Sequence, residues 1–130
     1  MSLILIVEDE VTLSLLAAMT LEDEGYEVVI AANGIQGVEA VRERAPDLVV
    51  TDYMMPVMDG VEMIRALRED GFAGPIVLTS AVSEAQVPGA ETLAYEGFLP
   101  KPYHEKRLLG LIEEHLGASG ETRGEPAQPG

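Results

Sequence analysis

Cysteine and tryptophan are absent from this chain of 130 residues, and basic residues are scarce. Without cysteine the chain has no disulfide and no thiolate chemistry, and a zinc site is disfavoured. This composition is compatible with the cytoplasm, where we expect the protein to act. Only 8 basic residues stand against 23 acidic ones, which gives a formal net charge of -15. A charge of that sign repels phosphate backbones, so we expect no direct binding to nucleic acid.

Long apolar runs are also missing. The run Leu3–Val7 has five residues, whereas a membrane-spanning helix needs about 20. Met1 and Ser2 offer no basic stretch before it, as a secretory signal would. We therefore expect no membrane association. The length favours one domain, which we place at residues 1–117. Residues 118–130 contain almost no large apolar side chain, so we expect an acidic, Gly- and Pro-containing disordered tail and no output domain.

Apolar, β-branched segments alternate along the chain with segments whose apolar residues recur at helical spacing. Strands are expected at residues 3–7, 26–31, 47–52, 75–80 and 97–101. Helices are expected at residues 11–24, from Gly34 to just before Pro46, from Val61 to near Gly71, and around Leu108 to Leu116. This alternation predicts right-handed crossovers and a parallel sheet covered on both faces. We predict an α/β fold, with a doubly wound five-stranded parallel sheet in a three-layer domain.

Polar side chains stand where the predicted strands end. Glu8 and Asp9 follow the first strand, Asp52 ends the third, Ser80 the fourth and Lys101 the fifth. Ligands of open parallel sheets bind at this edge. Three carboxylates placed together repel one another unless one is protonated or a divalent cation lies among them, and oxygen ligands suggest Mg²⁺. The pattern favours a phosphoryl-transfer site in which Asp52 is the nucleophile and Lys101 and Ser80 hold phosphoryl oxygens.

Four motifs in order now point to a known family. They are Val7-Glu8-Asp9-Glu10, Asp52 with Pro56 and Asp59-Gly60, Thr79-Ser80-Ala81, and Phe98-Leu99-Pro100-Lys101-Pro102-Tyr103. Over about residues 3–116 the sequence resembles the receiver domain of two-component response regulators, in particular single-domain, CheY-like ones. The resemblance implies the flavodoxin-like (βα)5 receiver fold.

The resemblance also implies how the acidic residues are used. Asp52 would be the phosphoacceptor. Asp9 and Asp52 would ligate Mg²⁺ directly, together with the backbone carbonyl of Met54, and Glu8 would help mainly through water. The protein would be a signalling switch, catalysing only its own phosphoryl transfer and dephosphorylation, and not an enzyme acting on other substrates.

Further family features concern the switch and the partners. Ser80 and Phe98 resemble the switch pair, and the peptide bond between Lys101 and Pro102 is expected to be cis. The phosphodonor would be a histidine kinase or a histidine phosphotransfer protein of a phosphorelay. The response would pass to a downstream protein target, such as a motor, an adaptor or a kinase. We expect a stand-alone regulator that is monomeric when unphosphorylated.

Other interpretations of these residues stay open. The chain could be a pseudo-receiver that binds proteins without phosphorylation. An aspartyl-nucleophile phosphatase would want an acid where Met54 stands, and a flavodoxin-like cofactor carrier would not place the acidic residues 8–10 at its phosphate loop. Ser80 could only cap the next segment and Phe98 could be plain core. We assign Asp59 to helix capping alone, and Met54, Met55 and Met58 to loop packing.

Two regions depart from the family pattern. Pro88-Gly89 falls where the fourth helix usually lies, so we expect that helix to begin late, near Pro88, or to be short. An output face that includes it is in doubt. Met54 and Val82, two residues after Asp52 and Ser80, offer no polar group to orient an attacking water. We expect a long-lived phosphoryl group.

The first helix shows apolar residues on both sides. An inward stripe is expected to contain Leu13, Leu16, Ala17, Thr20 and Leu21. Leu15, Ala18 and Met19 would then face solvent. This outer face either docks the helices of the phosphodonor or is a permissive surface without a partner.

Overall fold

The structure, a computed structural model, describes residues 1–116; the predicted tail at 118–130 lies outside the described residues. The strands are β1 (Leu3–Val7), β2 (Glu27–Ala31), β3 (Leu48–Asp52), β4 (Ile76–Ser80) and β5 (Gly97–Pro100). They form one parallel sheet in the order β2-β1-β3-β4-β5. The predicted doubly wound five-stranded sheet is thereby confirmed.

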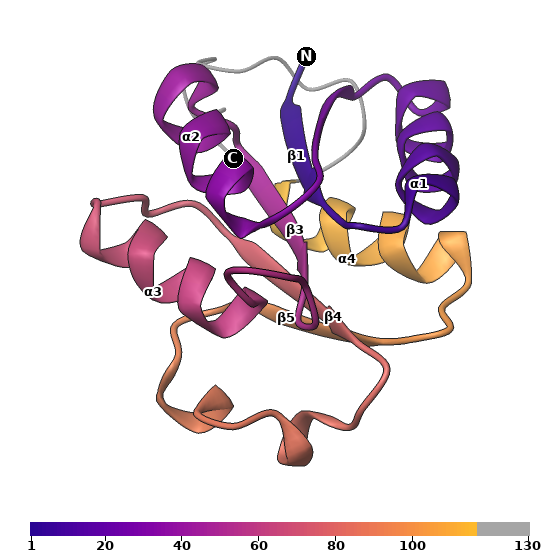
Figure 1. Ribbon diagram of the computed structural model, residues 1–130. Coiled ribbons are helices and arrows are strands. Elements are labelled where there is room, and N and C mark those ends of the chain that lie inside the picture. Colours follow the sequence, from indigo (N-terminus) through magenta and orange to yellow (C-terminus); the bar gives the residue numbers. More distant parts are fainter. Residues whose placement is uncertain (117–130) are drawn as a thin grey trace, which may run out of the picture.

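Four α-helices cover the two faces of this sheet (Figure 1). They are α1 (Val11–Asp23), α2 (Gly34–Arg44), α3 (Gly60–Glu69) and α4 (Glu105–Leu116). Helices α2 and α3 lie on one face, and α1 and α4 lie on the other. Among the described residues, no helix is long and apolar enough to cross a membrane.

The sheet separates two hydrophobic clusters, one under each pair of helices. Because successive strand residues point to opposite faces, Leu5 and Val7 of β1 join the cluster under α2 and α3, while Ile4 and Ile6 join the cluster under α1 and α4. Every residue of β1, β3 and β4 is buried. This explains why these strands are continuous apolar runs rather than alternating patterns.

The register of the sheet aligns the ends of the central strands. Val7 pairs with Thr51, Asp52 with Thr79, and Ser80 with Pro100. The polar residues that follow β1, β3 and β5 therefore emerge at one edge of the sheet, where the sequence pattern placed them.

No fifth α-helix lies between β4 and β5, within the part of the chain that the structure describes. Two short 3₁₀ turns, at Glu84–Gln86 and Ala90–Thr92, stand in its place (Figure 1). The prediction of an α-helix that begins near Pro88 is therefore wrong. The predicted interruption of the helix at Pro88-Gly89 is confirmed. Gly89 adopts a left-handed conformation with φ of 82°, and Pro88 cannot donate to a preceding turn. Together they divide the segment into two turns.

The buried side of α1 differs from the predicted stripe. Leu16 is 47% exposed, whereas Ala18 is buried at 6%. The buried positions are Ser14, Ala17, Ala18 and Leu21. Ser14 can occupy a core position because its hydroxyl donates to the carbonyl of Val11 at 2.9 Å, which satisfies the buried polar group. A polar residue therefore replaces the expected Leu16 in the interface.

Candidate functional site

An acidic cluster forms at the carboxyl edge of the sheet. Glu8 and Asp9 follow β1, Asp52 ends the neighbouring β3, and one carboxylate oxygen from each lies within 4.8 Å of the others. Glu8 and Asp52 are each only 6% exposed, whereas Asp9 is exposed. Adjacent parallel strands thus bring Asp52 together with Glu8 and Asp9, which lie far from it in the sequence.

Lys101 supplies the positive charge of the site. Its Nζ atom lies 2.9 Å from Oε1 of Glu8 and 3.1 Å from Oδ2 of Asp52. Burial lowers the pKa of Lys101, but the hydrogen bond to Glu8 and the charge of Asp52 outweigh it, so the pKa is raised and the ammonium stays protonated. The peptide bond from Lys101 to Pro102 is cis, as predicted.

The carboxyl group of Asp52 has an unusual affinity for protons. Burial and the nearby charge of Glu8 raise its pKa from 3.8 to about 6, and Lys101 only partly opposes them. A single ammonium cannot neutralise three clustered carboxylates. The site therefore retains excess negative charge, which a cation can offset.

The donor set fits Mg²⁺. All of the clustered side chains offer oxygen atoms, which this ion prefers, and two of the acids are held at fixed strand ends. Asp9 is exposed and Asp52 buried, so a metal between them could keep several waters on its open side. Lys101 already engages one oxygen of Glu8 and one of Asp52, so the second oxygen of Asp52 and the carboxylate of Asp9 are available for this role.

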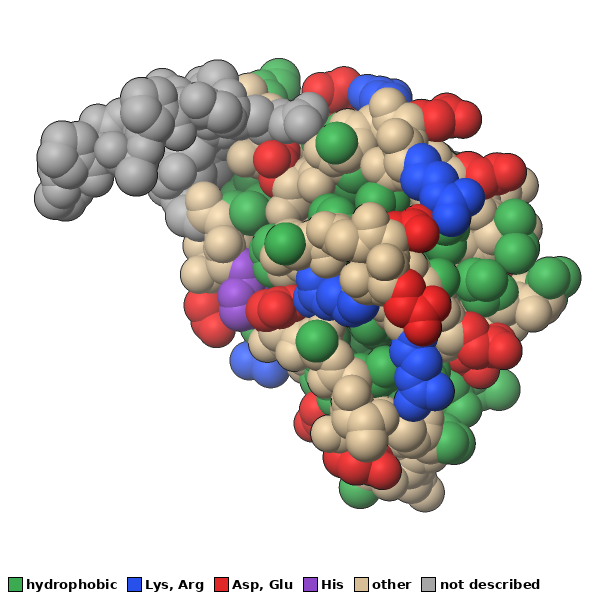
Figure 2. Space-filling view, turned by 90° about the vertical axis from the view of Figure 1, so that its left-hand side faces the viewer, with side chains coloured by type: hydrophobic (Ala, Val, Ile, Leu, Met, Phe, Trp, Pro, Cys, Tyr) green, Lys and Arg blue, Asp and Glu red, His purple; other side chains and the backbone are tan. Residues whose placement is uncertain are grey.

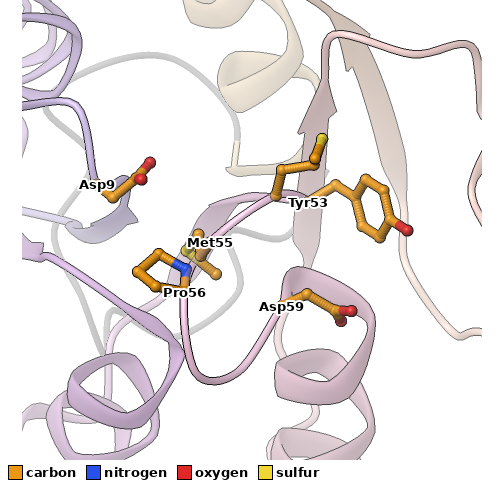
Figure 3. A pocket seen from close by; sticks show the side chains of 6 residues that line it. Asp9, Tyr53, Met55, Pro56 and Asp59 are labelled. Atoms are coloured by element: carbon orange, nitrogen blue, oxygen red, sulfur yellow. The ribbon is translucent and has the colours of Figure 1, made fainter.

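A cavity of about 470 Å³ opens beside the acidic cluster. It is lined by Asp9, Tyr53, Met54, Met55, Pro56 and Asp59. Figure 3 shows Asp9 on one side and the side chains of Tyr53 and Asp59 directed away from it. Asp59 instead accepts a hydrogen bond from the backbone N–H of Glu62 at 2.9 Å, and Glu62 accepts from the N–H of Asp59. This capping box confirms the predicted helix-capping role of Asp59.

Gly60 holds the loop against Asp52. A Cβ atom at this position would collide with the backbone carbonyl oxygen of Asp52. The backbone N–H of Gly60 donates to the carbonyl of Tyr53 at 2.7 Å. The start of α3 is therefore packed directly on the backbone that carries the carboxylate.

The same loop carries a strained residue, Val57. Its φ of 72° is in the left-handed region, which a β-branched side chain rarely adopts, and it is 86% exposed. We expect Val57→Gly to raise the free energy of unfolding by about 0.5 to 1 kcal/mol, because the relief of strain exceeds the added chain entropy. Urea denaturation measures this. Val57→Ala keeps a Cβ and should gain less; a loss of stability in the glycine variant would contradict the strain.

Ser80 and Phe98 lie on adjacent strands. Ser80 is fully buried, its hydroxyl oxygen accepts from the backbone N–H of Val82 at 3.0 Å, and its carbonyl accepts from the N–H of Lys101 at 2.7 Å. Phe98 is half-buried and packs on the core cluster under α2 and α3. Met54 is exposed at the cavity and Val82 is half-buried.

Two features of the site escaped the sequence analysis. The pairing of Glu8 with Lys101 needs the three-dimensional proximity of β1 and the end of β5. Tyr103 was only part of a motif, yet burial and the charge of Glu8 raise the pKa of its hydroxyl. It lines a second cavity of about 280 Å³ with Glu10, Leu13, Ala81, Lys101 and Pro102. The sequence signal that could have identified Tyr103 is an aromatic residue two positions after Lys101.

The sheet thus gathers three carboxylates and one lysine at its carboxyl edge, where open parallel sheets bind their ligands. The chain belongs to the response regulator receiver domain family, whose sequence model matches residues 4–113. Receiver domains bind Mg²⁺ at such an acidic pocket and act in two-component signalling. The predicted family membership is confirmed.

Relatives with curated names are response regulators. The chain is 31% identical over 113 residues to the DNA-binding response regulator MtrA of Mycobacterium tuberculosis, covering 87% of this chain and 50% of that protein. It is 35% identical over 119 residues to the uncharacterized transcriptional regulatory protein YkoG of Bacillus subtilis, covering 90% and 52%. The chain thus spans about half the length of these relatives.

Solved structures show the same fold. The chemotaxis response regulator CheY4 of Vibrio cholerae has a TM-score of 0.84 at 28% identity, covering 89% of this chain and 99% of that one. The response regulator TrrA of Thermotoga maritima, solved in complex with Mg²⁺ and BeF, has a TM-score of 0.81 at 28% identity, covering 89% and 100%.

Proposed function

We propose that this receiver accepts a phosphoryl group from a phosphohistidine on Asp52 and that the modified domain controls a protein partner. A carboxylate oxygen of Asp52 attacks phosphorus, the phosphorus–nitrogen bond to the donor imidazole breaks, and the ring nitrogen keeps the bonding electrons. The observation that supports this most strongly is the position of Asp52, buried among Glu8, Asp9 and Lys101 at the edge of the sheet.

The surrounding residues have separate roles in this proposal. Asp9 and Asp52, with the carbonyl of Met54, would hold Mg²⁺, and Glu8 would contribute mainly through water. When bound, the ion offsets negative charge on the transferring group. Lys101 places its ammonium within reach of Asp52 and would contact a phosphoryl oxygen there. This role requires the raised pKa that keeps Lys101 charged.

Incubation with acetyl phosphate and Mg²⁺, followed by intact-mass measurement, tests the proposal. The wild type should gain the mass of one phosphoryl group, and Asp52→Asn should not. Asp59→Asn is the matched control, because this acid lines the same cavity but caps α3; it should still be modified. No gain on the wild type would favour a pseudo-receiver, and a gain on Asp52→Asn would move the acceptor elsewhere.

The proposed switch involves Ser80 and Phe98. Phosphorylation adds roughly two negative charges and three acceptor oxygens. The hydroxyl oxygen of Ser80 now accepts from the N–H of Val82, and its own proton would be donated to one of these oxygens as the side chain moves toward the phosphoryl group. Phe98, half-buried beside it, would then turn inward. Identical NMR signals of Phe98 in phosphorylated and unmodified protein would contradict this switch.

The phosphodonor, a histidine kinase or histidine phosphotransfer protein, is proposed to dock on α1. Val11, Leu15, Leu16 and Met19 are exposed apolar residues of this helix. Because such side chains gain free energy when a partner covers them, they suit contact with apolar helices. Titration of a cognate donor should shift the NMR signals of Leu15 and Met19, while those of Ile30 on the edge strand β2 should stay unchanged. Unchanged α1 signals would overturn the assignment.

How the phosphorylated domain passes its signal to a partner stays a prediction. The curated relatives are about twice as long as the region matched, and their printed names refer to DNA binding or transcription. We propose that this chain acts as a stand-alone regulator through protein contacts, and that it is monomeric when unphosphorylated. Its charge of -15 disfavours direct binding to nucleic acid. Light scattering before and after phosphorylation measures the oligomeric state.

The lifetime of the phosphoryl group should depend on Met54. Its side chain is exposed at the cavity but offers no strong hydrogen-bonding group to an attacking water. We expect Met54→Asn to shorten the lifetime about fivefold, because one added hydrogen bond to that water stabilises the transition state. Loss of the phosphoryl mass over time measures the effect, and an unchanged lifetime would count against it.

A further inference from the structure

The loop between β3 and α3 presents a reactive sulfur at the mouth of the acidic site. Met54 is 62% exposed and lines the same cavity as Asp9, whose carboxylate clusters with that of Asp52. The chain contains no cysteine and six methionines. Thioethers are therefore its only sulfur groups that a peroxide can oxidise.

The methionines differ sharply in access to solvent. Met63, in the core under α3, is fully buried, whereas Met54 and Met19 are 62% and 61% exposed. Access of the oxidant to sulfur governs thioether oxidation. Met19 lies on α1 and does not line the cavity beside the acidic cluster. The chain thus contains three similarly exposed methionines, Met54 at the site and Met1 and Met19 away from it.

We propose that Met54 is a redox modification site through which a peroxide shortens the phosphorylated state. In this two-electron step the thioether sulfur attacks one peroxide oxygen and the oxygen–oxygen bond breaks. The sulfur becomes a sulfoxide, and the second oxygen leaves as water once protonated. Peroxide is reduced and sulfur oxidised, so the atoms and electrons balance. Reduction by a methionine sulfoxide reductase restores the thioether.

The modification changes the chemistry of a side chain that lines the cavity beside the acidic cluster. This consequence rests on the proposed function of Asp52. An apolar side chain becomes a polar one whose oxygen is a hydrogen-bond acceptor. The carboxylates of Glu8, Asp9 and Asp52 repel that oxygen, so its favourable partner is water. A water held there is available to attack the phosphoryl group, and the lifetime falls.

The experiment treats the protein with dilute hydrogen peroxide and maps each oxidised methionine by peptide mass. Met54 and Met19 should be oxidised while Met63 is protected. The protein is then phosphorylated with acetyl phosphate and Mg²⁺, and the decay of the phosphoryl mass is followed. Oxidised wild type should lose the group about fivefold faster than untreated protein. Treatment with the reductase should restore the original decay.

Two variants separate the site from general oxidation. Met19→Leu should keep the peroxide effect, and Met54→Leu should lose it. Met54→Gln, which carries an amide oxygen, should decay rapidly without peroxide. Protection of Met54 from peroxide, or equal decay of the phosphoryl group before and after its oxidation, would overturn this inference but not the proposed function. Failure of the untreated wild type to gain a phosphoryl group would overturn the proposed function and the inference with it.

Discussion

Replacing Asp52 with asparagine is expected to stabilise the protein at pH 8 in a buffer that contains a chelator. Burial and the charge of Glu8 raise the pKa of Asp52 from 3.8 to about 6 in the folded protein. The folded protein therefore holds this proton more tightly than the unfolded chain. The resulting stabilisation is fully present below about pH 4 and is lost as the pH rises through about 6. Above that pH, the ionised carboxylate of Asp52 lowers the free energy of unfolding by about 3 kcal/mol.

Urea denaturation of both proteins across this pH range measures the effect. Asp52→Asn should be more stable than the wild type by about 3 kcal/mol at pH 8, and the difference should shrink toward pH 4. Mg²⁺ should reduce the difference at pH 8, because the ion stabilises the ionised carboxylate. As control, Asp23→Asn removes an exposed acid at the end of α1 and should change stability by less than about 0.5 kcal/mol. A pH-independent difference would contradict the raised pKa.

The location of the site could be predicted from the sequence because two patterns reveal the order of strands and helices: continuous apolar runs and apolar residues at helical spacing. Continuous apolar runs identified the buried strands β1, β3 and β4, and parallel strands align their carboxyl ends. Glu8, Asp9 and Asp52 were therefore expected together, and the structure places their oxygens within 4.8 Å of one another. The ion pair between Glu8 and Lys101 could not be predicted this way, because it depends on the directions of two side chains at the ends of β1 and β5.

The burial of α1 was mispredicted for a physical reason. A stripe chosen by hydrophobicity alone placed Leu16 inside and Ala18 outside, and both assignments are wrong. Small residues allow a helix to approach the sheet closely, and Ser14 joins them once its hydroxyl bonds to Val11. The contacts of a helix therefore depend on size and hydrogen bonding as well as polarity.

The segment between β4 and β5 was predicted only in part. Pro88 and Gly89 revealed that a regular helix would be interrupted, but not what holds the 3₁₀ turns in place. Tyr95 donates a hydrogen bond to Glu84 across the segment, and Val87 and Ala90 are buried against the core. The raised pKa of Tyr95, about 12, reflects burial first and then this bond to Glu84. These contacts join residues that no local pattern relates.

Arg68 on α3 makes the largest polar contribution to this arrangement. Its guanidinium donates to the carbonyls of Phe72, Gly74 and Ala94 at 2.8 to 2.9 Å, and to Glu96 at 3.0 Å. Glu96 in turn accepts from the backbone N–H of Ile76 at 2.7 Å. Only 21% of the Arg68 side chain is exposed. The face over α2 and α3 shows basic groups interspersed with acidic ones (Figure 2). Arg42 of α2 pairs with Asp70 at 2.9 Å.

Arg68→Met is therefore expected to lower the free energy of unfolding by roughly 3 kcal/mol, because it leaves three carbonyls without the guanidinium donor and removes the cation paired with Glu96. Arg68→Lys keeps the charge but not the planar fork, so most of the loss should remain. Arg65→Met, one turn earlier on α3, removes only an exposed contact to Thr92 at 3.3 Å and should cost less than about 0.5 kcal/mol.

Urea denaturation gives these values, and hydrogen exchange locates the change. In Arg68→Met, faster exchange should begin at residues 81–96, since this segment loses its contacts from Arg68 to Ala94 and Glu96. Equal losses in the Arg65 and Arg68 variants, or unchanged exchange in the segment, would show that the buried apolar contacts of Val87 and Ala90 hold it without the arginine.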